Sequence, residues 1–430
     1  MRLLIYGINY APELTGVGKY TAEMADAIAA LGHEVRVVTA YPYYPAWKVK
    51  TGYRSWHYAT ETHKSIQVWR CPLWVPRKPS GLKRVLHLTS FAVSSLPLTL
   101  WQGLNWQPDV VFAIEPTFLC VTGSALAANL SRTKAWLHIQ DFEIDAGFNL
   151  GLIPSNKMIR TAISSIECWI MERFARISTI SERMLDRLQA KGVSLAKCVY
   201  FPNWVDTKTI YPLKVPSSLR EELAIAPDTF VALYAGSMAE KQGLEMLLAV
   251  AQQVAARKDI LFVLSGEGAA KKRLIDLAKT LPNVRFLDLQ PEERLNALLN
   301  LANVHLLPQL PNAADLVMPS KLKGMCASGR PTIATAALGT QIAQVVQQCG
   351  LVIPPADVKA MAKAIIYLAN DREKCLQLGE AARQYAIQHW DRQEVLSQLE
   401  RQLLELCSLS QSDLKPSIES SRLTLNRDRL

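Results

Sequence analysis

The sequence predicts an α/β protein made of two doubly wound parallel-sheet, Rossmann-like domains that face a central cleft. Short apolar runs alternate with amphipathic segments over the first 200 residues, and the same alternation resumes after residue 230. Short buried strands separated by amphipathic helices form a parallel sheet with helices on both faces. Ligands of such sheets bind beyond the carboxyl ends of the strands. The length of 430 residues fits two or three domains.

The first series of strands and helices begins close to the N-terminus. Its first helix is expected near Tyr20–Ala30, where apolar residues recur at helical spacing, and Gly32 is expected to end that helix. The strand-like runs are Leu3–Ile8, Val35–Thr39, Val110–Ala113, Ala135–His138 and Ile177–Ile180.

The second series predicts a second sheet. Its strand-like runs are Val231–Ala235, Leu261–Ser265, Val284–Leu287, Val304–Leu307, Thr332–Ala334 and Leu351–Ile353. Prolines and few apolar clusters mark residues 206–229 as a linker. We therefore expect one Rossmann-like domain over 1–205 and a second over 230–385. A C-terminal helix over 386–407 is expected to pack back across the domains, and the polar tail 408–430 to be disordered.

Composition limits the possible partners and compartment. Lys and Arg number 48 against 38 Asp and Glu, so the net charge of +10 favours an anionic partner such as a nucleotide, a phospholipid surface or nucleic acid. The eight cysteines form no CxxC pair and suit reduced thiols of a cytosolic protein. The N-terminal apolar run is too short for a signal peptide. The uncharged stretch Val85–Gln107 is interrupted by Pro97 and Gly103, so it is a poor membrane span.

Two glycine-containing loops are candidate phosphate sites. Gly16 and Gly18 open the first helix, where backbone N–H groups and the helix dipole favour an anion; a tight turn alone explains this pair equally well. Gly236 and Ser237 follow the first strand of the second series, and Lys241 and Gln242 precede the next helix. An ordinary loop is the alternative there, but two such loops at equivalent places favour one shared ligand.

A third motif lies in the second half of the chain. Pro319 and Ser320 suit a helix start, as first-turn proline and cap. Lys321 then falls in the first turn, where the helix dipole disfavours a cation unless an anion shares the place. The alternative is a solvated surface lysine. Gly329, Arg330 and Pro331 end this helix and lead into a strand.

A basic and aromatic segment precedes the uncharged stretch. Between residues 48 and 84 only Glu61 opposes nine basic residues, and four tryptophans are interleaved: Lys48, Lys50, Arg54, Lys64, Arg70, Arg77, Lys78, Lys83, Arg84, with Trp47, Trp56, Trp69 and Trp74. This pattern is typical of contact with an anionic membrane surface. A solvated face over a buried helix is the alternative, and no nucleic-acid-binding motif accompanies the charge.

Taken together, the motifs resemble a family-4 glycosyltransferase with the GT-B fold. The resemblance covers about residues 1–400 and rests on the Gly16/Gly18 loop, 32–35 (GHEV), 201–206 (FPNWVD), 234–236 (YAG), and the segments 319–321 (PSK) and 329–331 (GRP). Segments 10–13 (YAPE), 41–42 (YP) and 140–142 (QDF) are similar to the colanic-acid biosynthesis (WcaI-type) branch.

The resemblance implies a transferase that retains the anomeric configuration and requires no metal or other cofactor. It implies that the domain over 230–385 binds the nucleotide-sugar and the domain over 1–205 the acceptor. It implies that Ser320 and Lys321 contact the diphosphate of the donor, and that Asp315 is the acidic residue near the donor sugar. It places Gly16 and Gly18 against the diphosphate from the other domain. Asp141 would face the sugar or acceptor.

The sequence also departs from the family pattern. The family commonly has two glutamates separated by seven intervening residues, where this chain has Leu316, beside Asp315, and Gly324. Ser237 stands in place of a usual arginine. Gln242 stands in place of a lysine, with Lys241 one position earlier. The donor site is therefore less cationic than the family standard.

Electrostatic stabilisation of the leaving diphosphate by Lys321 and loop N–H groups is the expected source of catalysis. No carboxylate nucleophile is evident, so we expect a same-face mechanism in which the leaving phosphate takes the acceptor proton. His138, beside Gln140 and Asp141, either touches the acceptor or is a hydrogen-bonded histidine at a strand end.

The leading hypothesis is a hexosyl or deoxyhexosyl transferase that moves a sugar from a nucleotide-sugar to a lipid-linked saccharide in exopolysaccharide or cell-surface polysaccharide biosynthesis. It would be cytoplasmic and peripheral on the inner face of the plasma membrane. The alternatives are a nucleotide-sugar epimerase of the same fold and a non-catalytic nucleotide-sugar-binding protein.

Overall fold

A computed structural model describes residues 1–13, 16–78, 80–115, 118–142, 144–145, 148, 156–309 and 318–409. The chain forms two compact units. Unit 1 comprises 1–180, 184–201 and the chain from residue 396 onward, and unit 2 comprises 181–183 and 202–395. Each unit has its own sheet and its own buried core.

Unit 1 is built on an eight-stranded sheet with the order β3-β4-β2-β1-β5-β6-β7-β8. All neighbouring strands are parallel except β3 and β4, which form an antiparallel hairpin at one edge. The strands are β1 (Arg2–Tyr6), β2 (Glu34–Ala40), β3 (Ala59–His63), β4 (Ile66–Cys71), β5 (Val110–Glu115), β6 (Lys134–Ile139), β7 (Arg176–Thr179) and β8 (Cys198–Tyr200).

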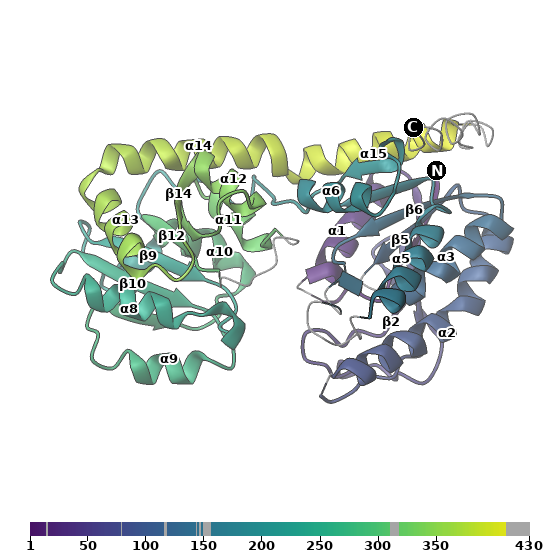
Figure 1. Ribbon diagram of the computed structural model, residues 1–430, viewed down its shortest axis with the longest axis horizontal. Coiled ribbons are helices and arrows are strands. Elements are labelled where there is room, and N and C mark those ends of the chain that lie inside the picture. The colour runs from purple at the N-terminus through teal and green to yellow at the C-terminus, as the bar shows by residue number, and fades with distance from the viewer. Residues whose placement is uncertain are drawn as a thin grey trace, which may run out of the picture. The chain divides into compact units, whose positions relative to one another are not determined.

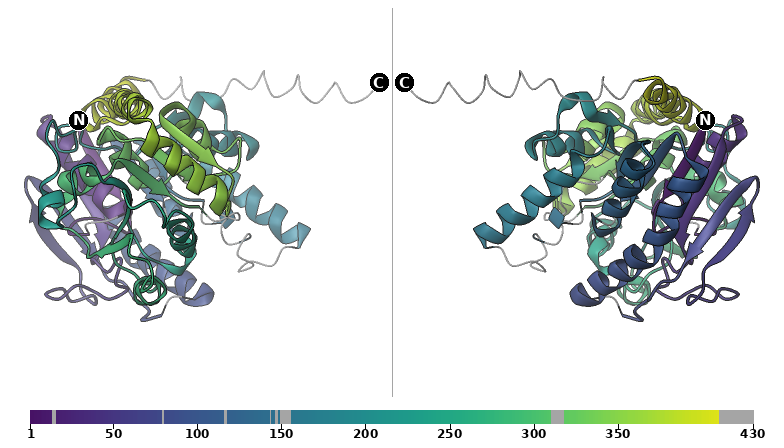
Figure 2. Two further views of the ribbon diagram at one scale, coloured as in Figure 1. Left: turned by 90° about the vertical axis from the view of Figure 1, so that its left-hand side faces the viewer. Right: turned by 90° about the vertical axis from the view of Figure 1, so that its right-hand side faces the viewer.

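Helices cover this sheet, and the longest of them, α2, packs along α3 (Figures 1 and 2). Pro97 lies inside α2. The helices are α1 (Gly16–Ala30), α2 (Gly81–Trp106), α3 (Phe118–Leu130), α5 (Lys157–Met171), α6 (Glu182–Ala190) and α15 (Arg392–Ser408), with a short 3-10 turn, η1 (Leu195–Lys197). Tyr6, Phe91 and Phe174 are buried in the core between the sheet and its helices.

Unit 2 has a fully parallel six-stranded sheet with the order β11-β10-β9-β12-β13-β14. Its strands are β9 (Phe230–Ala235), β10 (Ile260–Ser265), β11 (Val284–Leu287), β12 (Val304–Leu307), β13 (Thr332–Thr335) and β14 (Gly350–Ile353). β9 and β10 are almost wholly apolar and buried, which is typical of strands covered on both faces.

The helices of unit 2 alternate with these strands (Figure 1). They are α7 (Ser218–Glu222), α8 (Glu245–Gln253), α9 (Lys271–Leu277), α10 (Leu295–Leu301), α11 (Ser320–Ala327), α12 (Gln341–Cys349), α13 (Val358–Asn370) and α14 (Arg372–Trp390), with 3-10 turns η2 (Glu240–Gln242) and η3 (Glu292–Arg294). Helix α14 packs against α11 and α12, and this contact buries Trp390.

The predicted strands are confirmed, each within two residues at either end, and both sheets are doubly wound as expected. Three strands, β3, β4 and β8, were not predicted from the sequence. β3 reads Ala-Thr-Glu-Thr-His and lies at a sheet edge with exposed side chains, so it lacks the apolar pattern of the other strands. The sheet of unit 1 is therefore mixed rather than wholly parallel.

Residues 206–229 are packed in unit 2 instead of forming a free linker. Leu219 and Ile225 are buried in its core, and Ser217 donates a hydrogen bond to the carbonyl oxygen of Ala297 at 2.7 Å. The expected C-terminal helix corresponds to the end of α14 and to α15. Helix α15 belongs to unit 1 from residue 396 onward. Residues 410–430 of the predicted tail lie outside the described residues.

The uncharged stretch becomes the body of α2. Among the described helices, none has the length and apolar character needed to cross a membrane. The basic segment before it is mostly exposed, with one correction. Arg70 is buried, where it pairs with Glu61 and donates to the backbone carbonyls of Ala11 and Ala40, so it is not part of a surface patch.

Candidate active site

The strongest candidate site lies at the carboxyl end of the unit 2 sheet, where two glycine loops run against each other. The N–H of Gly236 donates to Ser265 at 3.0 Å, and that of Met238 donates to Glu267 at 2.8 Å. Gly266 and Gly268 have φ angles of +147° and +157°. A Cβ on Gly266 would lie 1.9 Å from the carbonyl oxygen of Gly236. Only glycine permits this approach, which extends the β9–β10 pairing into the loop.

The amine of Lys321 lies beside this loop. Lys321 Nζ is 4.5 Å from the centre of the Tyr234 ring and donates to the Tyr234 hydroxyl at 3.3 Å. The Tyr234 hydroxyl in turn donates to the carbonyl oxygen of Ser237 at 2.6 Å. A Cβ placed on Gly236 would lie 3.5 Å from Lys321 Nζ, so the amine faces the bare backbone of the loop.

Burial lowers the pKa of Lys321 to about 8. Among the described residues no carboxylate forms an ion pair with this amine. A half-buried ammonium group without a counter-ion favours an anion, because an anion would restore the charge compensation that burial removes. At Lys321, a cation, a glycine loop and the start of a helix therefore lie close together.

Helix α11 brings Lys321 to this position. Pro319 is the cap residue and Ser320 the first helical residue, which reverses the order expected from the sequence. Pro319 provides no side-chain cap, so the first-turn N–H groups have no side-chain acceptor from that residue. Asp315 lies outside the described residues.

The remaining predicted donor-site residues of unit 2 lie in the loop after β9 and in the η2 turn (Glu240–Gln242) that follows it. Ser237 is exposed and Gln242 half-buried, while the side chain of Lys241 is not among those described. Gly243 ends η2 with a φ of +62°.

The Gly16/Gly18 loop of unit 1 is built around a buried carboxylate. Glu13 accepts hydrogen bonds from the backbone N–H groups of Tyr43 and Tyr44, both at 2.9 Å, and from the side chain of Asn9 at 2.9 Å. A Cβ on Gly18 would lie 2.7 Å from Glu13 Oε2. Gly18 therefore allows the helix start to close over this carboxylate.

Gly16 has a φ of +62° and begins α1. The guanidinium of Arg70 donates a hydrogen bond to the carbonyl oxygen of Ala11, and this bond helps to hold the chain before the loop in place. The structure thus gives Glu13 and Arg70 structural roles that hold the loop in place. The sequence alone had placed Arg70 among the exposed charges of the basic segment.

His138 lies inside unit 1 at the end of β6. It is 2% exposed, and its ring nitrogens contact Ser178 Oγ at 2.9 Å and the amide of Gln140 at 3.1 Å. Burial lowers its pKa to about 3, so it is neutral at physiological pH. This geometry favours the role of a hydrogen-bonded support. Its assignment as a catalytic residue stays a prediction.

Asp141 comes directly after β6 and is half-buried. It lies at the carboxyl ends of the parallel strands, where the Gly16 loop also leaves β1. That position suits a residue facing a substrate. The sequence analysis did not identify Gly266 and Gly268. A glycine pair directly after a predicted strand is the signal that could have found them.

These features place the chain in the class of GT-B glycosyltransferases: two doubly wound units, each with a glycine loop after its first strand. Matches to family models agree. A glycosyl transferase 4-like domain matches residues 15–204, and glycosyl transferases group 1 matches residues 229–371.

The chain is 39% identical over 409 residues to the glycosyl transferase WcaI of Escherichia coli (strain K12), which is named for colanic acid biosynthesis. The match covers 93% of this chain and 98% of the relative. The chain belongs to this family of glycosyltransferases.

Two solved structures share the fold at low sequence identity. Sucrose-phosphate synthase from Thermosynechococcus elongatus has a TM-score of 0.72 at 18% identity, with 95% of this chain and 100% of that chain covered. Anabaena HepE, solved in complex with UDP and glucose, has a TM-score of 0.65 at 16% identity, with the same coverage.

Proposed function

We propose that the protein transfers a sugar, with retention at the anomeric carbon, from a nucleotide-sugar to a lipid-linked saccharide in exopolysaccharide or cell-surface polysaccharide biosynthesis. The donor binds in unit 2, with its diphosphate between the loop 236–238 and Lys321. Exopolysaccharide synthesis is favoured by the whole-length similarity to WcaI. A nucleotide-sugar donor is favoured by HepE, which was solved with UDP and glucose.

One observation carries this proposal: the ammonium group of Lys321 lies against the glycine backbone at the end of β9 without a carboxylate partner in the described residues. A diphosphate placed there would meet a cation, the first turn of α11, which has no side-chain cap, and the amide groups of the loop. Such preorganised donors stabilise the charge that develops on a leaving diphosphate.

The reaction follows from this electrostatic arrangement. The bond between the anomeric carbon and the diphosphate oxygen breaks, and its electron pair goes to the leaving diphosphate. The acceptor hydroxyl attacks on the same face and passes its proton to a phosphate oxygen. Lys321 and the backbone N–H groups hold the leaving oxygens, so we propose that the step requires no metal.

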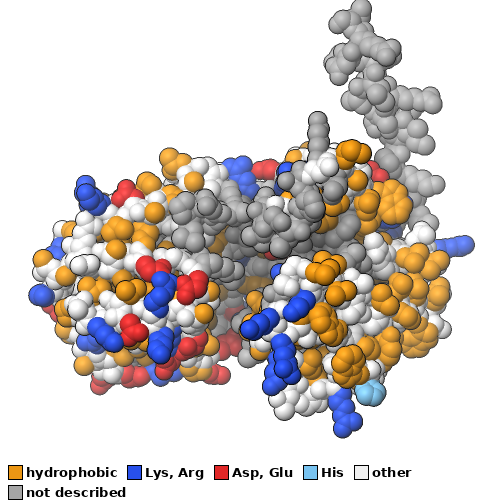
Figure 3. Space-filling model, turned by 60° about the horizontal axis from the view of Figure 1, so that its bottom comes forward, with side chains coloured by type: hydrophobic (Ala, Val, Ile, Leu, Met, Phe, Trp, Pro, Cys, Tyr) orange, Lys and Arg blue, Asp and Glu red, His pale blue; other side chains and the backbone are white. Residues whose placement is uncertain are grey.

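An exposed apolar face on α2 supports a membrane-bound acceptor. Val93 is 67% exposed and Trp101 is 50% exposed. Both lie on α2, whose opposite face is buried in unit 1. Exposed Lys83 and Arg84 lie in the first turn of the same helix. Figure 3 shows hydrophobic side chains gathered over this part of the molecule with Lys and Arg side chains nearby. An apolar face flanked by basic residues suits peripheral binding to an anionic inner membrane surface.

A transfer assay tests the function. Purified full-length protein is mixed with a bacterial lipid extract that contains lipid-linked saccharides and with radiolabelled UDP-, GDP- or dTDP-sugars. Label must move into the lipid fraction with one donor, and addition of EDTA must leave the rate unchanged. Lys321→Ala must reduce transfer at least about tenfold, the value expected for loss of a charge-assisted hydrogen bond.

Lys359→Ala, on the surface of α13, is the matched control and must transfer at the wild-type rate. Conversion of the donor sugar without any acceptor would identify an epimerase and contradict the proposal. Donor binding without transfer to any lipid fraction would identify a binding protein. Full activity of Lys321→Ala would remove Lys321 from the site.

Sedimentation with anionic vesicles at low salt tests the membrane contact separately. Val93→Ser must weaken binding, because it removes an exposed apolar side chain from α2. Leu338→Ser, at an exposed position of unit 2, is the control and must bind like the wild type. Equal binding of both variants, or none by the wild type, would contradict the proposed surface.

A further inference from the structure

A cavity of about 180 Å³ opens at the amino-terminal edge of the unit 2 sheet. Phe230 begins β9, and Asn303 and Pro331 directly precede β12 and β13; all three line the cavity. In a parallel sheet the amino-terminal ends of all strands lie on one side and the carboxyl ends on the other. The cavity lies at the amino-terminal ends, whereas the Gly236 loop follows the carboxyl end of β9. The cavity is therefore separate from the proposed donor site.

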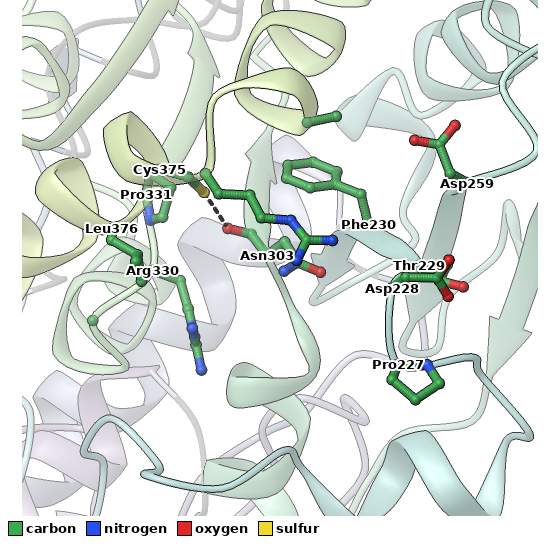
Figure 4. A pocket seen from close by; sticks show the side chains of 13 residues that line it. Pro227, Asp228, Thr229, Phe230, Asp259, Asn303, Arg330, Pro331, Cys375 and Leu376 are labelled. Carbon is green, nitrogen blue, oxygen red and sulfur yellow. Dashed lines mark hydrogen bonds between the residues drawn. The ribbon is translucent and has the colours of Figure 1, made fainter.

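Arg330 is the distinctive residue of this cavity (Figure 4). Its Nε atom is buried and has no hydrogen-bond partner in the described part of the chain. Its one hydrogen bond there is long, from Nη2 to Asn300 Oδ1 at 3.5 Å. A guanidinium carries five N–H donors. Leaving a buried charged donor unpaired is costly, so the site favours an acceptor that the protein itself does not provide.

Two further arginines surround the same place. Arg372 lines the cavity from the first turn of α14, and Arg220 lies close enough for its pKa to be lowered by burial and by the charges of Arg330 and Arg372. The hydrogen bonds of Arg220 go to carbonyl oxygens. None of the three arginines forms an ion pair with a described carboxylate. Asp228 lies near enough to Arg220 to raise its pKa, but it forms no ion pair with it. Three neighbouring guanidinium groups without an ion pair in the described part of the chain favour a multivalent anion.

The other side of the cavity carries carboxylates. Asp228 and Asp259 lie across the view from Arg330 in Figure 4. Arg257 holds Asp259 with two hydrogen bonds of 2.8 and 2.7 Å. Carboxylate oxygens accept hydrogen bonds from hydroxyl groups. A ligand that joins an anionic group to a hydroxyl-bearing body therefore matches both sides.

The size of the cavity limits this ligand. Its volume of about 180 Å³ lies below the roughly 300–1,000 Å³ of sites for drug-sized molecules. A nucleotide-sugar is too large. We propose that the cavity binds a small phosphate monoester, with phosphoryl oxygens on Arg330 and Arg372 and hydroxyl groups toward Asp228. The phosphoryl group is shared by inorganic phosphate and by sugar phosphates.

Isothermal titration of the full-length protein with inorganic phosphate and, separately, with a hexose 6-phosphate tests the proposal. Both must bind, and Arg330→Gln must weaken binding at least about tenfold, as loss of a charge-assisted pair implies. Arg372→Gln changes an exposed residue and must also weaken it, which keeps the test valid if the first variant fails to fold. Arg294→Gln, an exposed arginine paired with Glu222, is the control and must bind normally.

Tighter binding of the hexose 6-phosphate than of phosphate would assign the carboxylate side to the sugar hydroxyls, and equal binding would assign the site to the phosphoryl group alone. Lys321→Ala must leave unchanged the binding that Arg330→Gln weakens, since Lys321 lies near the carboxyl ends of the strands and the cavity at their amino-terminal ends. The proposal would be overturned by absence of binding at millimolar concentration, by equal binding in the arginine variants, or by loss of binding in Lys321→Ala alone. These outcomes are independent of whether the protein transfers sugars.

Discussion

Lys323 on α11 is a buried lysine whose removal should stabilise the protein. Its side chain is 1% exposed, and its amine has no hydrogen-bond partner in the described part of the chain. The amine faces the ring of Trp390, whose centre lies 5.2 Å from Nζ. Burial lowers the pKa of Lys323 to about 8.

This pKa gives the size of the effect. A fall from the ordinary value of 10.5 to about 8, at about 1.4 kcal/mol per pKa unit, corresponds to a folding penalty of about 3 kcal/mol. Loss of the cation–π contact offsets about 0.5–2 kcal/mol of that. Lys323→Met keeps the volume and removes the charge, so it should raise the free energy of unfolding by about 1–3 kcal/mol at pH 7.

The pH dependence follows from the same shift. Below pH 8 the folded and unfolded states both carry the proton, and the penalty is complete. Between pH 8 and 10.5 the folded state releases the proton first, so the stability of the wild type rises toward that of the variant. The difference between the two should therefore be largest at pH 7 and shrink toward pH 10.5.

Urea unfolding followed by tryptophan fluorescence at pH 7 and at pH 10 measures the difference. Lys363→Met, at an exposed position of α13, is the matched control and should change stability by less than about 0.5 kcal/mol. A Lys323→Met variant that is less stable than the wild type at pH 7, or a difference that grows with pH, would refute the reasoning.

Two further predictions concern the glycine loops. Gly266→Ala should lower the free energy of unfolding by about 2–6 kcal/mol, the combined cost of backbone strain and overpacking against Gly236. Gly339 is the control, with a φ of +86° and open space around it. Gly339→Ala should lower the free energy of unfolding only by the strain of about 1–3 kcal/mol. Equal losses in urea titrations would disprove the close contact. Glu13→Gln should lower the free energy of unfolding by about 1–3 kcal/mol. The new amide N–H₂ group would face an N–H group that now donates a hydrogen bond to the carboxylate. Thermal unfolding at pH 7 measures this loss, and an unchanged melting temperature would show that the three hydrogen bonds are not formed.

The fold could be predicted from the sequence because its strands are buried on both faces and read as apolar runs. β9 and β10 are examples, since nearly every side chain in them lies in the core. β3 could not be predicted, because its stability comes from pairing with β4 and its side chains lie at an exposed edge. The segment 206–229 resembled a linker because it has few apolar residues. Leu219, one of them, packs against core residues that are distant in the sequence, such as Val263 and Leu298.

The candidate site was predicted in part. Lys321 stood out because a cation in the first turn of a helix contradicts the helix dipole, and the structure places it beside Gly236. The opposing pair Gly266 and Gly268 was not found, since its role depends on the neighbouring strand. Arg70 was misplaced because net charge along a sequence does not reveal which guanidinium a fold encloses.

Direct binding of donor nucleotides tests the central claim most closely. Calorimetric titration of the full-length protein with UDP, GDP and dTDP should show binding of one of them, and Lys321→Ala should weaken that binding by about 10- to 150-fold, equivalent to about 1.5–3 kcal/mol. An unchanged affinity in Lys321→Ala, or no binding of any nucleotide to the wild type, would contradict the account.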